Sequence, residues 1–166
     1  MRNALFPDLD EFLSLSRFSD GRIDYSHADK APVLVCFVRC NGKILLLKRS
    51  EKVRTYQGKW NTVTGYLDEL QSLRTKILKE LHEELRIQEK DIVSLIFGKP
   101  YIFFDMSLQK TWIIHPALAD LREVPSLVLD WEHTEYVWIL PEELLHFDIV
   151  PRLEESLYRV LKKHKS

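Results

Sequence analysis

A single α/β domain is the fold class that the sequence predicts. The chain has 166 residues, of which 45% are hydrophobic, enough for one sizeable core. Its predicted elements run in the order strands, helix, strands, helix, which is typical of a mixed α/β domain. No internal repeat, low-complexity tract or linker interrupts this order in the sequence. We therefore expect one domain over residues 31–166, preceded by an N-terminal extension over residues 1–30 that packs on it.

The first predicted elements are a short helix and a β-hairpin. Residues 8–18 favour the helix, and residues 19–22 (SDGR) favour a turn. Residues 31–50 contain two runs rich in β-branched and aliphatic side chains, separated by Asn41 and Gly42. An Asn-Gly pair favours the positive φ angles of a two-residue hairpin turn. We therefore expect two antiparallel strands joined at this pair.

The middle of the chain predicts a short strand, one long helix and further strands. A polar loop leads into the short strand at residues 60–64, which is followed by Gly65. The helix covers residues 72 to about 86. Further β-rich segments lie at residues 92–104, 110–121 and 133–140.

Two prolines near the C-terminus predict helix starts. Proline suits the first turn of a helix because that turn does not need its missing N–H group. Pro141 and Pro151 each precede a helical pattern. We expect helices over residues 141–147 and 151–165.

Composition narrows the class of protein. The 24 basic and 25 acidic residues give a net charge of −1, so no global field favours long nucleic acid or an anionic membrane as a partner. No apolar run is long enough to cross a bilayer, and the N-terminus lacks the pattern of a signal peptide. Cys36 and Cys40 share one apolar segment and are expected to be buried thiols in a reducing compartment. We expect a cytoplasmic protein, and a homodimer formed through the N-terminal segment is left open.

Three glutamates crowd the last turns of the long predicted helix. Its apolar stripe is formed by Leu73, Ile77, Leu78, Leu81 and Leu85. Glu80 and Glu84 lie four residues apart along the edge of this stripe, with Glu83 beside them. Glu84 falls where the core partly shields it, and a shielded anion next to two others is unfavourable unless a cation lies among them. Mg²⁺ and Mn²⁺ prefer oxygen ligands of this kind.

The same acids have a second interpretation. Lys76 can pair with Glu80 and Lys79 with Glu83, both four residues apart, so that the acids decorate a solvated face. Exposed pairs of this kind contribute only about 0.2 to 0.5 kcal/mol each, and they leave Glu84 without a partner. The helix taken alone leaves both interpretations open.

With its flanks, the segment resembles a Nudix box, the signature of hydrolases that cleave diphosphates linked to another moiety. The box is written GX5EX7REUXEEXGU, where U is a bulky aliphatic residue, and residues 65–87 keep its spacing without insertion or deletion. The positions that match are Gly65, Glu80, Leu81, Glu83, Glu84 and Ile87. Flanking segments are also similar, so that the resemblance covers approximately residues 31–160.

The resemblance implies an α/β/α sandwich with a mixed sheet and a hydrolase that uses Mg²⁺ or Mn²⁺. The expected substrate is a nucleoside diphosphate derivative or a similar small phosphorylated molecule. Glu80 and Glu84 would be primary metal ligands and catalytic residues, and Glu83 a ligand or an orienting residue. A later carboxylate often completes such a site or acts as the base. The candidates for it are Glu132 and Glu135, with Asp120 behind them, although an ordinary surface acid is the commoner explanation for each of them.

Residues outside the box supply further candidates. Arg49 and Lys59 can meet the substrate phosphates, although a solvated strand end explains them equally well. Tyr66 or Trp131 can stack on a ring of the substrate. The histidines carry no expected metal role: His82 points to the other side of the helix, and His115 and His133 are expected to be hydrogen-bonded histidines of a strand or loop.

Three positions depart from the box. Lys79 replaces an arginine and lacks its bidentate fork, which predicts looser orientation of the acids. Gln71 replaces the first glutamate, which predicts weaker metal binding. Arg86 replaces a glycine that ends the helix in a left-handed conformation, at a cost of roughly 1 kcal/mol. These departures motivate an alternative function, a catalytically weakened Nudix-fold protein that binds a nucleotide or acts as a regulator.

Overall fold

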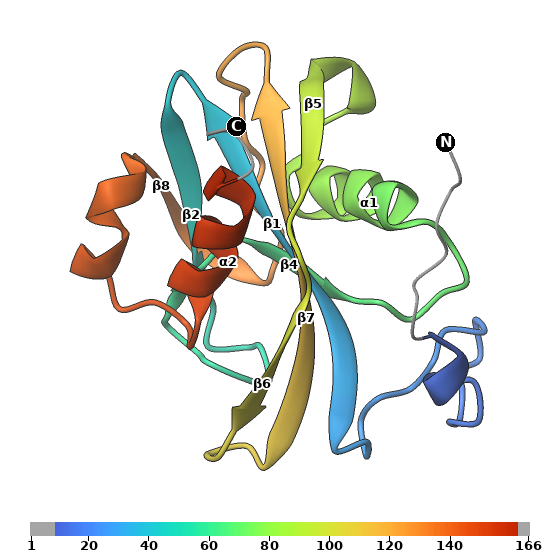
Figure 1. The fold of residues 1–166 in the computed structure, drawn as a ribbon. Helices are drawn as coiled ribbons and strands as arrows, with labels where there is room; N and C mark the ends of the chain where they lie inside the picture. The colour runs from blue at the N-terminus through green and yellow to red at the C-terminus, as the bar shows by residue number, and fades with distance from the viewer. Residues whose placement is uncertain (1–8, 163–166) are drawn as a thin grey trace.

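An eight-stranded mixed sheet organises the chain, and the computed structural model describes residues 9–162 of it (Figure 1). The main path of the sheet is β3-β2-β1-β7-β5, while β4 pairs with β1, β6 with β7 and β8 with β2. The β1·β7 pair is parallel and the other pairs are antiparallel. The strands are β1 (Lys30–Cys40), β2 (Lys43–Arg49), β3 (Trp60–Asn61), β4 (Val63–Tyr66), β5 (Ile92–Phe97), β6 (Tyr101–Asp105), β7 (Lys110–Leu121) and β8 (His133–Ile139).

The predicted hairpin at the start of the domain is confirmed. Strands β1 and β2 pair in antiparallel fashion, with Cys40 opposite Lys43. Asn41 and Gly42 between them have φ angles of 51° and 75°. Both residues therefore adopt the left-handed conformations that favour an Asn-Gly pair at a two-residue turn.

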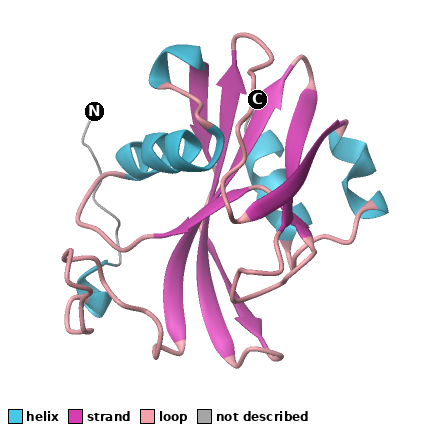
Figure 2. Ribbon diagram, turned by 180° about the vertical axis from the view of Figure 1, so that it is seen from behind, coloured by secondary structure: helices cyan, strands magenta, loops and turns pink. Residues whose placement is uncertain are grey.

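Two α-helices lie on opposite faces of the sheet, which confirms the predicted α/β/α sandwich (Figures 1 and 2). Helix α1 (Leu73–Leu85) buries Ile77, Leu81 and Leu85. Helix α2 (Leu153–Leu161) covers the other face and packs against β7. None of the helices in residues 9–162 is both long and apolar enough to span a membrane.

Both ends of helix α1 carry recognisable caps. The Ser72 hydroxyl accepts a hydrogen bond from the Thr75 N–H at 3.1 Å, which satisfies a donor of the first turn. Arg86 follows the helix with φ 62° and ψ 22°. Its N–H donates to the His82 carbonyl at 2.9 Å, and the Ile87 N–H donates to the Leu81 carbonyl at 3.2 Å. The left-handed helix end is therefore kept although an arginine occupies it.

Several predicted helices are shorter or more tightly wound than expected. The helices predicted at residues 8–18 and 141–147 are 3-10 helices, η1 (Leu9–Phe12) and η3 (Pro141–His146), and a further one is η2 (Glu89–Asp91). A 3-10 helix is common in short pieces, because its i to i+3 hydrogen bonds close a turn in few residues. Helix α2 begins at Leu153 rather than at Pro151, because Arg152 has a φ angle of 65°. Residues 163–165 of that predicted helix lie outside the described residues.

The described part of the N-terminal extension contributes to the core. Phe12, Ile23 and Tyr25 are buried in the main hydrophobic cluster. The Tyr25 hydroxyl donates to the Leu67 carbonyl at 2.7 Å, and the Ile23 N–H donates to the Asp68 carbonyl at 2.8 Å. Residues 9–29 thus support the connection between β4 and α1. Residues 1–8 lie outside the described part, and the division of the chain near residue 31 stays a prediction.

The cysteines lie where the apolar pattern predicts them. Cys36 and Cys40 are both buried free thiols on β1. Burial raises the pKa of the Cys36 thiol to about 12, so this side chain acts as a small apolar group of the core.

Candidate metal and substrate site

Glu84 is a buried carboxylate in the last turn of α1. Only 2% of the surface of this residue is exposed to solvent. Neither of its oxygens accepts a hydrogen bond from an N–H or hydroxyl group of residues 9–162. Burial, and then the neighbouring charges of Glu80 and Glu132, raise the pKa of Glu84 well above its ordinary value. The fold therefore holds an acidic group in a place that disfavours its negative charge.

Glu132 and His133 approach Glu84 from the start of β8. Ligand atoms of these three residues lie within 4.8 Å of one another. Strand β8 pairs with β2, which places His133 opposite Arg49 in the sheet. The Ser50 N–H donates to the Glu132 carbonyl at 2.7 Å and fixes the loop backbone. The sheet thus delivers a second carboxylate and an imidazole to the end of α1.

The His133 ring is placed as a neutral imidazole with a free nitrogen. Its Nδ1 atom lies 3.3 Å from Asp130 Oδ1, and burial lowers the pKa of the ring. Its Nε2 atom is buried and has no hydrogen-bond partner among the described residues. A neutral ring that donates from Nδ1 to Asp130 carries its lone pair on Nε2.

Glu80 and Glu83 extend the acidic cluster along α1. Burial raises the pKa of Glu80, while Lys76, whose Nζ lies 2.9 Å from Glu80 Oε1, opposes that rise. Glu83 is exposed, and its charge acts on both Glu80 and Glu132. The three helix acids and Glu132 therefore share one electrostatic environment, which we call the acid cluster (Glu80, Glu83, Glu84 and Glu132).

Gly65 allows α1 to approach strand β4 at this cluster. A Cβ atom added to this glycine would lie 2.8 Å from both Cδ and Oε1 of Glu80. Real Cβ atoms do not approach other atoms so closely, so any larger residue would displace the Glu80 carboxylate. The opening glycine of the motif thus has a direct steric role.

A cavity of about 540 Å³ opens beside the acid cluster. Gly65 and Glu132 are among its lining residues. Its aromatic wall contains Tyr25, Tyr56, Tyr66, Phe103, Trp112 and Trp131, and its cations include Arg49, Lys52, Arg54 and Arg152. The Tyr25 and Tyr66 rings stack with centroids 5.5 Å apart, and Trp131 is 61% exposed at the rim. Such a wall offers flat apolar surface for a ring, with cations for anionic groups.

The structure brings some of the predicted substrate-binding residues to this site and not others. Arg49 lines the cavity and donates from Nε to the Thr55 carbonyl at 3.0 Å. Lys59 pairs with Asp148 at 2.8 Å, and Glu135 pairs with Lys48 at 3.1 Å. Neither Lys59 nor Glu135 lines the cavity.

Asp120, the remaining predicted acid, also lies elsewhere. Its Oδ1 is 2.6 Å from Arg39 Nε, across the parallel β1·β7 pair. Glu132 is consequently the late carboxylate that the fold places beside the helix acids.

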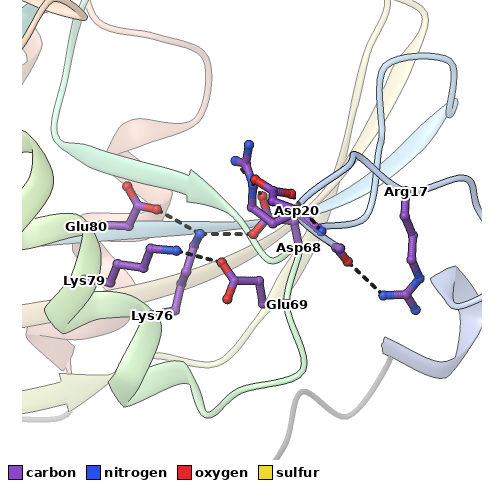
Figure 3. Close-up of polar contacts among 9 residues, drawn as sticks. Arg17, Asp20, Asp68, Glu69, Lys76, Lys79 and Glu80 are labelled. Atoms are coloured by element: carbon purple, nitrogen blue, oxygen red, sulfur yellow. Dashed lines mark hydrogen bonds and ion pairs between the residues drawn. The ribbon is translucent and has the colours of Figure 1, made fainter.

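A chain of ion pairs lies on the other side of Glu80 (Figure 3). Lys76 bridges Glu80 and Asp68, with its Nζ 3.1 Å from Asp68 Oδ1. Of the two pairs in the solvated-face interpretation, Lys76–Glu80 is present, whereas Lys79 Nζ lies 2.7 Å from Glu69 Oε1 instead of pairing with Glu83. The loop between β4 and α1 carries both Asp68 and Glu69, and it presents these acids to the two lysines.

Sequence reasoning missed two contributors to the site, His133 and Lys76. His133 was expected to be an ordinary hydrogen-bonded residue, and its position directly after Glu132 was the available signal. One of the two interpretations of the helix places Lys76 on a solvated face, yet it is 3% exposed. Its position next to the apolar Ile77, one turn before Glu80, indicates burial only once the packing of α1 is known.

The donor set fits a hard divalent cation. Neither buried oxygen of Glu84 has a hydrogen-bond donor among residues 9–162, and the carboxylate of Glu132 and the imidazole of His133 lie beside them. A cation bound among these atoms would remove the unfavourable burial of negative charge. Oxygen-rich sets of this kind suit Mg²⁺ and Mn²⁺, and an added imidazole is better tolerated by Mn²⁺.

Comparison with known proteins identifies the family and the fold. The sequence profile of the NUDIX domain matches residues 29–160. The nucleoside triphosphatase NudI of Escherichia coli is 25% identical over 129 residues, which cover 70% of this chain and 86% of that protein. The MutT protein of Methanosarcina mazei has a similar structure, with a TM-score of 0.67, 26% identity, and coverage of 84% of this chain and 99% of that one. The NUDIX domain of Shewanella oneidensis NrtR, in complex with ADP ribose, has a TM-score of 0.68 at 13% identity, with coverage of 82% and 89%.

Proposed function

We propose that this chain, which belongs to the Nudix hydrolase family, cleaves diphosphate linkages in small nucleotide derivatives. The proposed reaction depends on a divalent metal. The observation that carries the proposal is Glu84, a buried carboxylate without a hydrogen-bond donor beside Glu132 and His133. A divalent cation explains this arrangement and supplies the chemistry of the reaction. NudI, a relative by sequence, is a nucleoside triphosphatase, which supports a nucleotide substrate.

In this proposal the acid cluster holds Mg²⁺ or Mn²⁺. Glu84 and Glu80 are the primary ligands, Glu83 is a ligand or orients one, and Glu132 completes the set. When bound, the metal neutralises the diphosphate and lowers the pKa of a water molecule. Burial raises the pKa of Glu132, and its carboxylate is the group we assign to accept the proton of the attacking water.

The cavity beside the cluster binds the rest of the substrate. Arg49, Lys52 and Arg54 line it and face the phosphate groups in our assignment. Tyr66 and Trp131 offer ring faces on which a base or a similar ring stacks. Because Gly65 and Glu132 both line the cavity, we assign the phosphates of the bound substrate to the part of the cavity next to the acid cluster.

The test is an assay of the purified protein with Mg²⁺ against nucleotide sugars, dinucleoside polyphosphates and nucleoside triphosphates. Glu84→Gln should lower kcat by about 100-fold or more, since even the outer-shell partners of a metal contribute 10- to 100-fold. Glu142→Gln, an exposed acid outside the cavity, should retain the wild-type rate. Unchanged turnover in Glu84→Gln would contradict the catalytic assignment.

A second candidate function is nucleotide binding without turnover. The observation that favours it is the Lys76–Glu80 ion pair, which engages a predicted metal ligand at 2.9 Å. Stabilisation by nucleotides in a thermal-shift screen, with no cleavage of any compound in the panel, would support this function over hydrolysis.

A further inference from the structure

We propose that Lys76 and Asp68 form the pair that positions Glu80, in place of the residues that the Nudix pattern puts at positions 79 and 71. This inference rests on the proposed function, because it concerns how a metal ligand is held. The pattern has an arginine at 79 and a glutamate at 71, whereas this chain has Lys79 and Gln71. Other groups of this chain must therefore orient the acid cluster.

The geometry assigns that role to Lys76. Its Nζ lies 2.9 Å from Glu80 Oε1 and 3.1 Å from Asp68 Oδ1, and the lysine side chain is 4% exposed (Figure 3). Both contacts are ion pairs between the ammonium group and a carboxylate. A buried cation between two carboxylates has little freedom to leave, and it holds Glu80 against one side of the cluster.

Lys79 does not take this role. Its Nζ lies 2.7 Å from Glu69 Oε1, and both side chains of this pair are about one-third exposed, at 38% and 32%. The partly solvated pair belongs to the loop before α1 rather than to the acid cluster. The positive charge at position 79 therefore pairs with Glu69 and does not contact the acid cluster through this ion pair.

Asp68 is itself fixed by the N-terminal segment. Its carbonyl accepts the Ile23 N–H at 2.8 Å, and its Oδ2 lies 3.6 Å from Arg22 Nη1. The residues form a continuous series, Arg22 to Asp68 to Lys76 to Glu80, that runs from the N-terminal segment to the metal ligands. Lys76 is thus a positioning residue whose own anchor is tied to residues before the first strand.

Mn²⁺ binding tests the assignment without relying on turnover. Titration of the metal-free full chain, followed by electron paramagnetic resonance, gives a Kd for wild type, Lys76→Met and Lys79→Met. We expect Lys76→Met to weaken the Mn²⁺ affinity by about 10-fold, in the range of outer-shell changes at metal sites, and Lys79→Met to change it less than about twofold. Arg74→Gln removes a charge from the same helix by breaking an exposed pair between Arg74 and Glu89, and it controls for helix charge.

The outcomes separate the inference from the function on which it rests. A wild-type protein that binds no Mn²⁺ would overturn both. Wild-type binding that survives in Lys76→Met, or that falls equally in Lys79→Met, would overturn the inference alone.

Two further variants keep the test decisive if Lys76→Met does not fold. Asp68→Asn keeps the size of its side chain and the Lys76–Glu80 pair, and should weaken Mn²⁺ binding about threefold. The triple change Lys76→Ala, Gln71→Glu and Lys79→Arg restores the residues of the family pattern. It should return the Kd to within about threefold of wild type, and failure to do so while folded would contradict the proposed equivalence of the two arrangements.

Discussion

Glu80 and Glu84, one turn apart on the same helix, have opposite surroundings. Burial raises the pKa of both carboxyl groups. Glu80 faces a buried lysine at 2.9 Å, whereas the charges that act most strongly on Glu84 are those of other acids. The charge of Glu80 is therefore compensated within the chain, whereas the surroundings of Glu84 have an excess of negative charge.

The difference teaches how a metal site can be distinguished from a structural ion-pair network. Both kinds of site gather acids on a helix, and acid count alone does not separate them. Within an ion-pair network, cations of the chain contact the carboxylates, as Lys76 does at Oδ1 of Asp68 and at one oxygen, Oε1, of Glu80. A metal site leaves buried oxygens without donors, as at Glu84, because a bound cation completes them.

The largest expected effect comes from removing the compensating cation. Lys76→Met leaves Glu80 and Asp68 buried without it, and breaking a buried pair in this way costs about 3 to 5 kcal/mol. We expect the free energy of unfolding, measured by urea denaturation in EDTA, to fall by that amount. Lys79→Met is the matched control and should cost less than about 1 kcal/mol, because its pair is partly solvated. Equal losses in the two variants would show that the two lysines are not distinguished by burial.

Removing the uncompensated charge of Glu84 should instead increase the stability of the metal-free protein. Glu84→Gln in EDTA should raise the free energy of unfolding by about 1 to 3 kcal/mol at a pH above the raised pKa of Glu84, because a neutral amide then replaces a buried anion and brings donors toward Glu132. Addition of Mg²⁺ should reverse the order. At about 100 times its Kd the metal stabilises wild type by about 2.7 kcal/mol, and it should not stabilise the variant to this extent.

The pH dependence of this effect follows from the raised pKa of Glu84. Between the ordinary carboxyl pKa and the raised pKa of Glu84, the folded protein binds more protons than the unfolded chain. The stability of metal-free wild type should therefore fall as the pH rises through that window. Glu84→Gln should lose this part of the fall, so that its advantage over wild type disappears toward about pH 4. An advantage that is independent of pH would exclude the titration of Glu84 as its cause.

Gly65→Ala tests whether the position of Glu80, the compensated carboxylate, matters for metal binding. The added Cβ would lie 2.8 Å from the Glu80 carboxyl, which is the end of a flexible side chain and can move. We expect a loss of less than about 1 kcal/mol in stability but a roughly tenfold weaker Mn²⁺ Kd, comparable to other changes that misplace a metal ligand. Isothermal titration with Mn²⁺ measures the second quantity. An unchanged Kd would mean that Glu80 does not need its present position to bind metal.

The elements that carry this site could be predicted from local patterns. Asn41 and Gly42 specify a hairpin through their own φ preferences, and the spacing of leucines specifies which side of α1 is buried. The spacing of Glu80, Glu83 and Glu84 follows from helix geometry alone. These features depend on residues close in sequence, and the structure agrees with the elements predicted from them.

The partners of the charges could not be predicted in the same way. Both Lys76 and Lys79 have a glutamate four residues later, so helix geometry treats them alike. The loop before α1 decides between them by placing Asp68 against one and Glu69 against the other. The choice of Glu132 over Glu135 likewise depends on tertiary structure, because β8 pairs Glu135 with Lys48 on β2 and leaves Glu132 in the preceding loop.

The smallest expected effect comes from Arg86, two residues after Glu84. A substitution there should change the stability without changing the metal affinity. Arg86 has a φ angle of 62°, a conformation that costs a non-glycine residue roughly 1 kcal/mol. Arg86→Gly should remove most of this strain, although the glycine also loosens the unfolded chain, so we expect a net gain of about 0.5 kcal/mol in urea denaturation. The Mn²⁺ Kd should stay within twofold of wild type, because Arg86 is exposed and touches neither Lys76 nor Glu84 through any ion pair found in residues 9–162. A gain in Mn²⁺ affinity together with the gain in stability would instead show that the strained helix end displaces Glu84 from its best position, and that the departure at residue 86 weakens the site.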